Sequence, residues 1–385
     1  MKKPTTRREL LRLGVGAALA ASATRLLPGC AAAQRKVEDL PVPAPHPDLC
    51  ATPAARGANA ARVVAVKGLD LPAMTREALE GVGGIAAVVK AGDRVFVKPN
   101  MVTLPWASAI FDPLRGGECT KVELLVAVAE ACLEAGAAEV VIGDASQQPR
   151  FDWSRARSLD GATNLVDEAR RLSTRHGRPV RLVCLDAETP EWIEVPTALS
   201  FGKVAVSSLV LHTDKVISVP VAKTHRWGYF TLSIKNFIGV TPLARYGWGD
   251  HGRVDRYQLH INDRSPRDFN RLAVDIAKAV KPALAIVDMS IGMEGDGPSR
   301  GTGGTAIDVR KKLGAWLVLA STDLAAADAT AARIMGQDEW KVQEILGMAR
   351  DEGLGAMCAG DIDLVGGPLE ALQMHWKPAR PGKFE

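Results

Sequence analysis

Short apolar, β-branched runs alternate with amphipathic stretches of helical period along most of the 385 residues. Runs that are apolar on both faces and are separated by helices are typical of a largely parallel sheet covered on both sides. The strand-like runs are Arg62–Val66, Arg94–Lys98, Glu139–Gly143, Val180–Leu185, Lys215–Val219, Leu284–Asp288, Trp316–Leu319 and Ile362–Val365. The helical stretches fall near Met74–Val89, Lys121–Ala135, Asn164–His176, Phe269–Val280, Asp323–Met335 and Lys341–Glu352. The pattern predicts an α/β fold with a largely parallel central sheet and helices on both faces.

Several of these predicted strands end in polar residues. The endings are Lys98-Pro99-Asn100, Gly143–Ser146, Lys223-Thr224-His225 and Asp288. In a parallel sheet the carboxyl ends of the strands meet at one rim, where open α/β sheets bind their ligands. The sequence therefore predicts a single ligand cleft at the carboxyl ends of the strands.

The N-terminus has the features of an export signal. Arg7-Arg8 precede a short apolar run, Leu13–Ala23, which ends too early for a membrane span. Residues 1–30 are therefore interpreted as a twin-arginine signal, which delivers folded proteins to the periplasm or cell envelope, so that any cofactor would be loaded in the cytoplasm. Cys30 fits the lipid-bearing position of a lipoprotein, which would attach the chain to a membrane by lipid only. Ala31–Ala33 offers a rival cleavage site that would release a soluble product.

The remaining chain divides by composition. Residues 31–60 are rich in Ala and Pro and are interpreted as a tether, residues 61–378 as the α/β domain, in one body or two lobes, and residues 379–385 as a tail. Removing residues 1–29 takes away six basic residues and one acid, so the formal charge of +4 becomes −1. A mature domain without net positive charge gives no support to nucleic-acid binding.

Six cysteines are present, and none lies in a C-x-x-C arrangement. This spacing excludes a ferredoxin-type iron–sulfur module or a zinc ribbon as a reading of the sequence. Cys132 and Cys184 lie in apolar helix and strand contexts and are predicted to be buried. In an oxidising compartment other cysteines could pair, and the spacing leaves the partners open.

The segment Asp214–Pro242 carries the densest set of candidate site residues. Lys223 and His225 lie two apart on extended backbone and share a face, so one can hold an anion while the other moves a proton. Pro99 fixes the chain beside Lys98, which suits a carboxylate or phosphate. We assign catalytic roles to His225, Lys223 and Lys235, and ligand binding to Lys98, Asn100 and Asn236. The alternative for Lys235 is a structural ion pair with Asp144 or Asp288.

Three carboxylates are candidate ligands for a divalent metal. Asp288 and Glu294 form the best pair, and Asp144 would complete the set; they could instead act as a general base. The glycines from Gly292 to Gly304 make the following loop pliable, either as a mobile lid or as an anion cradle. The loop lacks the residues of a P-loop, and the dinucleotide fingerprint is absent.

Several segments of the chain resemble domain of unknown function family 362. The resemblance rests on GDRVFVKPNMV at 92–102, EAGAAEVVIGDAS at 134–146, VPVAKTH with TLSIKNFIGV within 219–240, and PALAIVDMSIGMEGDGP at 282–298, with further matching segments at 323–336 and 353–367. Many members carry a ferredoxin-like cysteine module, and this chain departs from them in having none. The family name carries no reaction. A more distant similarity to the nickel-pincer lactate racemase family would make Lys235 and His251 the pair that holds an organonickel cofactor.

The leading expectation is an exported enzyme that acts on a small anionic, carboxylate-type metabolite with a metal or other cofactor. The alternative is a periplasmic binding lipoprotein for a metal complex or an anion. A scaffolding protein of the envelope is a third reading, and it predicts that the polar strand ends do not converge.

Overall fold

The computed structural model describes Cys50 and residues 60–107, 110–200, 202–226, 228–246, 266–337 and 339–380. The predicted export signal with Cys30, nearly all of the predicted tether, His251 and most of the predicted tail lie outside the described residues. What the sequence indicates about them therefore stays a prediction.

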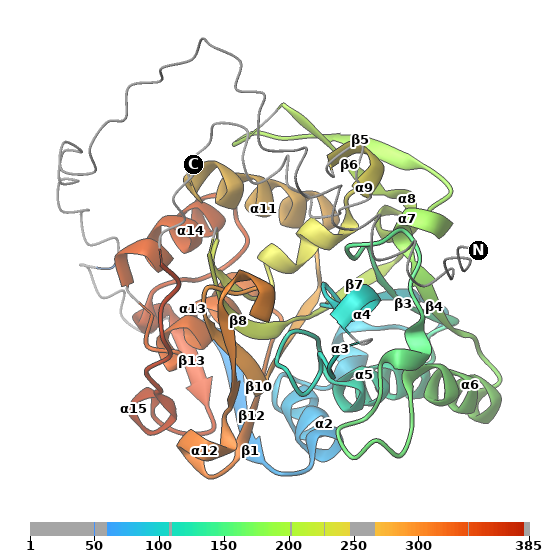
Figure 1. The fold of residues 1–385 in the computed structure, drawn as a ribbon, viewed down its shortest axis with the longest axis horizontal. Coiled ribbons are helices and arrows are strands. Elements are labelled where there is room, and N and C mark those ends of the chain that lie inside the picture. Colours follow the sequence, from blue (N-terminus) through green and yellow to red (C-terminus); the bar gives the residue numbers. More distant parts are fainter. Residues whose placement is uncertain are drawn as a thin grey trace, which may run out of the picture. The chain divides into compact units, whose positions relative to one another are not determined.

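A mostly parallel sheet forms the centre of the fold (Figure 1). Its main path has the order β13-β1-β12-β10-β7-β2-β3-β4. Neighbours from β10 to β4 pair in parallel, as do β1 and β13, whereas β12 is antiparallel to both of its neighbours. The strands of this path are β1 (Ala61–Gly68), β2 (Arg94–Pro99), β3 (Glu139–Asp144), β4 (Val180–Cys184), β7 (Lys215–Val219), β10 (Leu284–Gly295), β12 (Trp316–Ser321) and β13 (Ile362–Val365). The predicted α/β fold with a largely parallel sheet is confirmed.

Helices cover both faces of the sheet (Figure 1). One face packs against α2 (Leu71–Gly81), α5 (Val122–Glu134) and α6 (Leu165–His176), and the other against α11 (Pro266–Val280), α13 (Leu324–Ile334) and α14 (Glu339–Asp351). Side chains alternate between the two cores along each strand: in β1, Val64 and Val66 join the first core, and Val63 and Ala65 the second. Shorter helices are α3 (Ile85–Val88), α4 (Leu104–Ala107), α7 (Leu185–Glu188), α8 (Ser208–Leu211), α9 (Leu243–Tyr246), α12 (Arg310–Leu313), α15 (Leu369–Leu372), η2 (Trp153–Arg155), η4 (Arg300–Thr302) and η5 (Ala359–Asp361).

The first predicted helix, Met74–Val89, is two helices in the structure. Asp70 caps the start of α2 by accepting a hydrogen bond from the Ala73 amide. The chain then turns at Gly83 and Gly84, whose φ angles of +100° and +80° are adopted readily only by glycine. The helix α3 follows this turn. The apolar period continues through the break, which is why the pattern alone did not show it.

The order of the strands creates a switch point between β2 and β7. From β2 the chain continues outward through β3 to β4, whereas from β7 it leaves in the opposite direction to β10. A crevice opens at the carboxyl ends of two such neighbouring strands in open α/β sheets. Beyond Pro220 the chain extends as β8 (Val221–His225), turns back as β9 (Tyr229–Thr231) and forms the 3₁₀ helix η3 (Lys235–Val240). These segments carry most of the predicted site residues.

Besides β8 and β9, two further hairpins extend the structure beyond the main path of the sheet. β11 (Gly304–Asp308) pairs antiparallel with the far half of β10, and β5 (Trp192–Pro196) pairs with β6 (Lys203–Ser207) in a separate two-stranded sheet. Among the residues that the structure describes, no helix is long and apolar enough to cross a membrane.

A disulfide joins Cys50 to Cys358, with the two Cα atoms 5.6 Å apart. It ties the chain ahead of β1 to the turn before β13. Cys119, Cys132 and Cys184 are free and buried, which confirms the prediction for Cys132 and Cys184.

Candidate functional site

A buried ion pair marks the carboxyl ends of β2 and β3. The Lys98 ammonium lies 2.6 Å from Asp144 Oδ1, and the two side chains are 1% and 4% exposed. Lys98 Nζ also donates to the Pro99 carbonyl at 2.7 Å, and Asp144 Oδ2 accepts from the Met101 amide at 2.7 Å. Each charge is therefore paired and hydrogen-bonded, the condition under which an ion pair is tolerated away from water.

The helix η3 lies directly over this pair. Asn236 Nδ2 donates to the Lys98 carbonyl at 2.8 Å and to Ser218 Oγ at 3.2 Å, which fastens η3 to the ends of β2 and β7. A Cβ built on Gly239 would lie 2.4 Å from Asp144 Oδ1 and 2.8 Å from Lys98 Nζ. Only a residue without a side chain leaves the ion pair intact at this position.

Lys223, in β8, is fully buried beside the same strand ends. Its ammonium donates to the Glu118 carbonyl at 2.7 Å and to Asn100 Oδ1 at 3.2 Å. Burial lowers the pKa of Lys223 to about 8, against the smaller opposing effects of Cys119 and Glu118. Asn100 is only partly buried, and its side-chain NH₂ group has no hydrogen-bond partner among the described residues. It can therefore donate to a ligand.

Lys235 and His225 share the ring of Phe269. The Lys235 ammonium lies 5.2 Å from the centre of that ring, and the His225 imidazole stacks on it with centroids 6.3 Å apart. His225 Nδ1 accepts a hydrogen bond from the Gly228 amide at 3.1 Å, so the neutral ring carries its proton on Nε2. Burial, with the charges of Lys223 and Lys98, holds the pKa of Lys235 well below the ordinary lysine range.

Asp328, in α13, holds the chain just before η3. Its carboxylate accepts hydrogen bonds from the amides of Ser233 at 2.7 Å and Ile234 at 2.9 Å. Asp328 is fully buried, and burial raises the pKa of its carboxyl to about 7. This clamp fixes where Lys235 and Asn236 begin, although Asp328 lies nearly a hundred residues away in the sequence.

The structure thus brings seven predicted residues together around the switch point: Lys98, Asn100, Asp144, Lys223, His225, Lys235 and Asn236. Hydrogen bonds link Asp144 to Lys98, Lys98 to Asn236, and Asn100 to Lys223. Convergence of this kind is the opposite of what the scaffold interpretation predicts.

The predicted carboxylate metal site is not assembled. Asp144 is engaged by Lys98, Asp288 by Lys121 at 3.2 Å and by the Ser290 hydroxyl at 2.5 Å, and Glu294 by the Lys377 amide at 3.0 Å. In the described part of the chain, no group of three or more His, Cys, Asp and Glu side chains is arranged to hold a metal ion. Each carboxylate instead neutralises a lysine or fixes a backbone amide, which the spacing of acids in the sequence does not reveal.

The glycine-rich loop after β10 packs on the body of the protein. Glu118 Oε1 accepts from the Arg300 amide at 2.7 Å, and the Arg300 guanidinium lies 4.5 Å from the centre of the Phe111 ring. A Cβ on Gly297 would lie 2.2 Å from the Thr224 carbonyl oxygen, so the loop backbone lies directly against β8. These contacts hold the loop beside the strand that carries Lys223.

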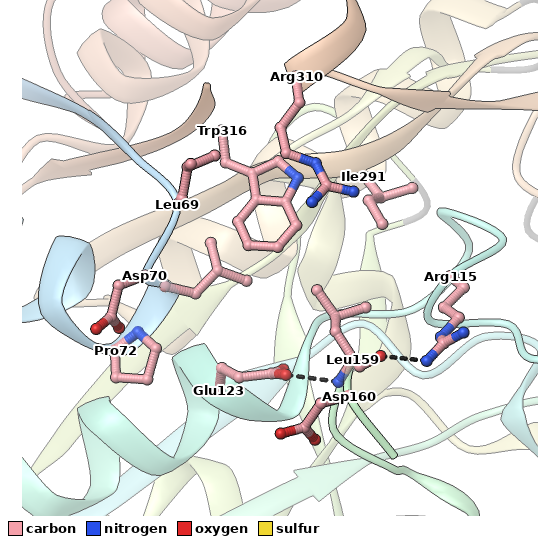
Figure 2. A pocket seen from close by; sticks show the side chains of 11 residues that line it. Leu69, Asp70, Pro72, Arg115, Glu123, Leu159, Asp160, Ile291, Arg310 and Trp316 are labelled. Carbon is pink, nitrogen blue, oxygen red and sulfur yellow. Dashed lines mark hydrogen bonds between the residues drawn. The ribbon is translucent and has the colours of Figure 1, made fainter. Parts of the chain in front are cut away.

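A separate cavity of about 730 Å³ lies near the end of β1 (Figure 2). Trp316, Leu69 and Leu159 give it apolar walls, and none of the predicted site residues lines it. Glu123 Oε1 accepts from the Leu159 amide and Arg115 donates to the Leu159 carbonyl, while Glu123 Oε2 is buried without a hydrogen-bond partner among the described residues. The lysine cluster and this cavity are therefore distinct features.

Sequence reasoning did not identify three residues that shape the lysine cluster: Glu118, Phe269 and Asp328. An acid within the Ala-rich run of α13 was a usable signal for Asp328, because an unpaired buried carboxylate is costly. The other two are visible only through contacts between segments distant in sequence.

Comparisons with known proteins agree with the sequence motifs. Residues 95–333 match the family described as domain of unknown function (DUF362). A thylakoid-associated protein from Synechocystis sp. is 28% identical over 312 residues, which cover 80% of this chain and 83% of that protein.

Two solved structures align with part of the chain. The lactate racemase apoprotein from Thermoanaerobacterium thermosaccharolyticum aligns with a TM-score of 0.32 at 16% identity, over 60% of this chain and 51% of that chain. A protein from Thermotoga maritima aligns with a TM-score of 0.37 at 12% identity, over 74% and 60%. The family match extends over more than half of the sequence and includes every one of the seven converging residues. The chain therefore belongs to the domain of unknown function 362 family.

Proposed function

We propose that the protein is an enzyme that binds a small carboxylate-bearing metabolite over the ends of β2 and β7 and transfers a proton there. The observation that carries the proposal is the gathering of Lys98, Lys223 and Lys235 at the switch point of the sheet. One carboxylate, Asp144, is hydrogen-bonded to this group, at Lys98. Lys223 donates only to the Glu118 carbonyl and the Asn100 amide oxygen, so no carboxylate among the described residues lies within ion-pair distance of it, and its positive charge favours an anionic ligand.

The exposure of the side chains supports a division of roles. Lys98 and Lys223 are fully covered and would stabilise an anion through their field, whereas Asn100 and Lys235 are partly exposed and would meet it directly. Groups whose pKa lies near neutrality exchange protons efficiently at physiological pH. The pKa of about 8 at Lys223 and the lowered pKa of Lys235 make proton transfer easier than at ordinary lysines, which favours an enzyme over a protein that only binds. His225, across the Phe269 ring from Lys235, is the second proton carrier in this proposal.

We expect small carboxylates to raise the melting temperature of the protein, and matched uncharged amides to leave it unchanged. Asn100→Asp places a carboxylate beside Lys223 with almost no change in side-chain shape. The new carboxylate repels the ligand carboxylate and neutralises the Lys223 ammonium, so it should weaken carboxylate binding by at least about tenfold. Asn164→Asp is the matched control. Asn164 caps α6, where aspartate caps equally well. Calorimetric titration of both variants measures the effect.

Binding should also weaken as the pH rises above about 8, because Lys223 loses its positive charge there. Lys223→Met should remove this pH dependence. If no carboxylate shifts the melting temperature, or if Asn100→Asp binds as well as the native protein, the proposed site is wrong. Carboxylate binding without turnover of any bound acid would favour the alternative of a binding protein.

We also propose that the chain is exported by the twin-arginine route and carries a lipid on Cys30. The Cys50–Cys358 disulfide supports an oxidising compartment, and the relative from Synechocystis is described as thylakoid-associated. Changing Arg7 and Arg8 to lysine should retain the precursor in the cytoplasm, and Cys30→Ser should abolish labelling by a radioactive fatty acid. Unchanged export of the doubly substituted chain in cell fractionation would contradict the route, and unchanged labelling would contradict the anchor.

A further inference from the structure

Lys235 is held differently from the other lysines of the cluster. Its aliphatic stem lies against the backbone of Gly228, where an added Cβ would lie 3.0 Å from Lys235 Cδ and Cε and 3.1 Å from a Phe269 ring carbon. The stem is therefore confined between a glycine and an aromatic ring, which gives the amine a fixed direction. The side chain remains partly exposed, so a small molecule can reach it.

The charges around Lys235 are those of an activated amine. Lys98 has Asp144 at 2.6 Å and Lys121 has Asp288 at 3.2 Å, but among the described residues no carboxylate lies within ion-pair distance of Lys235. Burial lowers its pKa well below the ordinary lysine value, and the positive charges of Lys223 and Lys98 lower it further. A lysine that is buried beside other cations loses its proton more readily than an exposed lysine, and the neutral amine is a strong nucleophile.

We propose that Lys235 forms an imine with the carbonyl carbon of a short 2-oxo acid whose carboxylate is bound by Asn100 in the field of Lys98 and Lys223. This inference rests on the proposed anion site and names its substrate class. A carboxylate directly bonded to a carbonyl group suits a site in which the anion-binding groups and the free amine converge. His225 and Lys235 both lie against the Phe269 ring, so a proton carrier belongs to the same cluster as the reacting amine.

The lone pair of Lys235 Nζ attacks the carbonyl carbon, the carbonyl π bond breaks, and the oxygen takes up the proton that Nζ releases, which gives a neutral tetrahedral carbinolamine. Loss of that oxygen as water, with a second proton supplied through His225, leaves a protonated imine. Its positive charge would be unfavourable beside two lysines, and the carboxylate of the bound acid offsets it. The imine then withdraws electrons from the bonds at the adjacent carbon, as Schiff-base enzymes require.

Borohydride trapping tests this inference, because hydride converts the imine to a stable secondary amine. The full-length protein would be incubated with pyruvate and sodium borohydride at pH 7, and the modified residue located by peptide mass spectrometry. Acetone supplies the carbonyl without the carboxylate, and propionate the carboxylate without the carbonyl. We expect pyruvate to label Lys235 at least about tenfold more than the half-exposed Lys278, and acetone and propionate to give no selective label.

Lys235→Arg should abolish the selective label and keep a positive charge, and Lys278→Arg is the matched control that should retain it. If pyruvate raises the melting temperature but Lys235 stays unmodified, the imine is wrong and the anion site stands. If pyruvate neither binds nor labels, both proposals are wrong. Equal labelling of Lys235 by acetone would overturn the assignment of the substrate class.

Discussion

Asp144→Ala is expected to lower the free energy of unfolding by about 3–5 kcal/mol, among the largest effects of any single substitution in this chain. The change leaves the ammonium of Lys98, 1% exposed, without a counter-charge, and the Met101 amide without its acceptor. Urea denaturation monitored by circular dichroism measures the loss. Added formate or acetate should partly restore stability, because a small carboxylate can occupy the place of the missing side chain.

Glu139→Ala is the matched control for Asp144→Ala, because Glu139 lies in the same strand. Its partners, Arg94 and Arg181, are each 47% exposed, so removing these ion pairs should cost less than about 1 kcal/mol. Equal losses in the two variants would show that Lys98 does not depend on Asp144. The proposed anion site would then lose the rigid pair on which η3 rests.

Asp328→Ala should lower the free energy of unfolding by about 2–4 kcal/mol and should also weaken carboxylate binding. The substitution leaves the buried amides of Ser233 and Ile234 without acceptors, each at a cost of about 1–3 kcal/mol. It also releases the start of η3, which positions Lys235. Asp328 acts by positioning, so we expect lower affinity for carboxylates and loss of the selective pyruvate label while the protein remains folded.

Asp275→Ala separates this positioning effect from general loss of stability. Asp275 is a buried aspartate in α11 that accepts hydrogen bonds from the amides of Ala198 and Leu199. Its removal should destabilise the protein to a similar extent but leave carboxylate affinity unchanged. Equal losses of carboxylate affinity in Asp328→Ala and Asp275→Ala would contradict the positioning role of Asp328. Normal carboxylate affinity in Asp328→Ala would also contradict it.

The pH dependence of stability gives a second test of Asp328. Because burial raises the pKa of this carboxyl from 3.8 to about 7, the folded protein holds a proton between these values that the unfolded chain has released. The stabilisation from Asp328 is therefore fully present below pH 3.8 and is lost as the pH rises through about 7. The difference in unfolding free energy between the native protein and Asp328→Ala should be larger at pH 4 than at pH 8. A constant difference would exclude the raised pKa.

The sheet was predictable because each of its main strands is recognisable from its own short stretch of sequence. β2, β3, β7 and β12 are continuous apolar runs flanked by amphipathic helices, and burial on both faces requires that composition. The break between α2 and α3 was missed because apolar residues continue to recur at helical spacing through Gly83 and Gly84. β8, β9 and η3 were not assigned as separate elements, since their polar residues are buried only by contacts with distant strands.

The candidate lysines could be named from the sequence, but their partners could not. A lysine at the end of a strand is recognisable, whereas the choice of Asp144 for Lys98 and of Lys121 for Asp288 depends on which strands are neighbours. The predicted metal ligands were grouped by residue type alone. In the structure Asp144 and Asp288 each pair with a buried lysine, and Glu294 accepts a hydrogen bond from the Lys377 amide.

The sequence by itself determined the α/β architecture, the rim of the sheet where the candidate residues lie and the family, because the apolar period and the strand-end motifs are local properties of the chain. Tertiary structure alone decided that Lys235 lacks a carboxylate partner among the described residues while Lys98 has one, and that Gly239 and Asp328 hold η3 over the strand ends. Ionisation and reactivity depend on burial and on charges brought together across long sequence separations. These quantities exist only once β2, β3, β8 and η3 have packed.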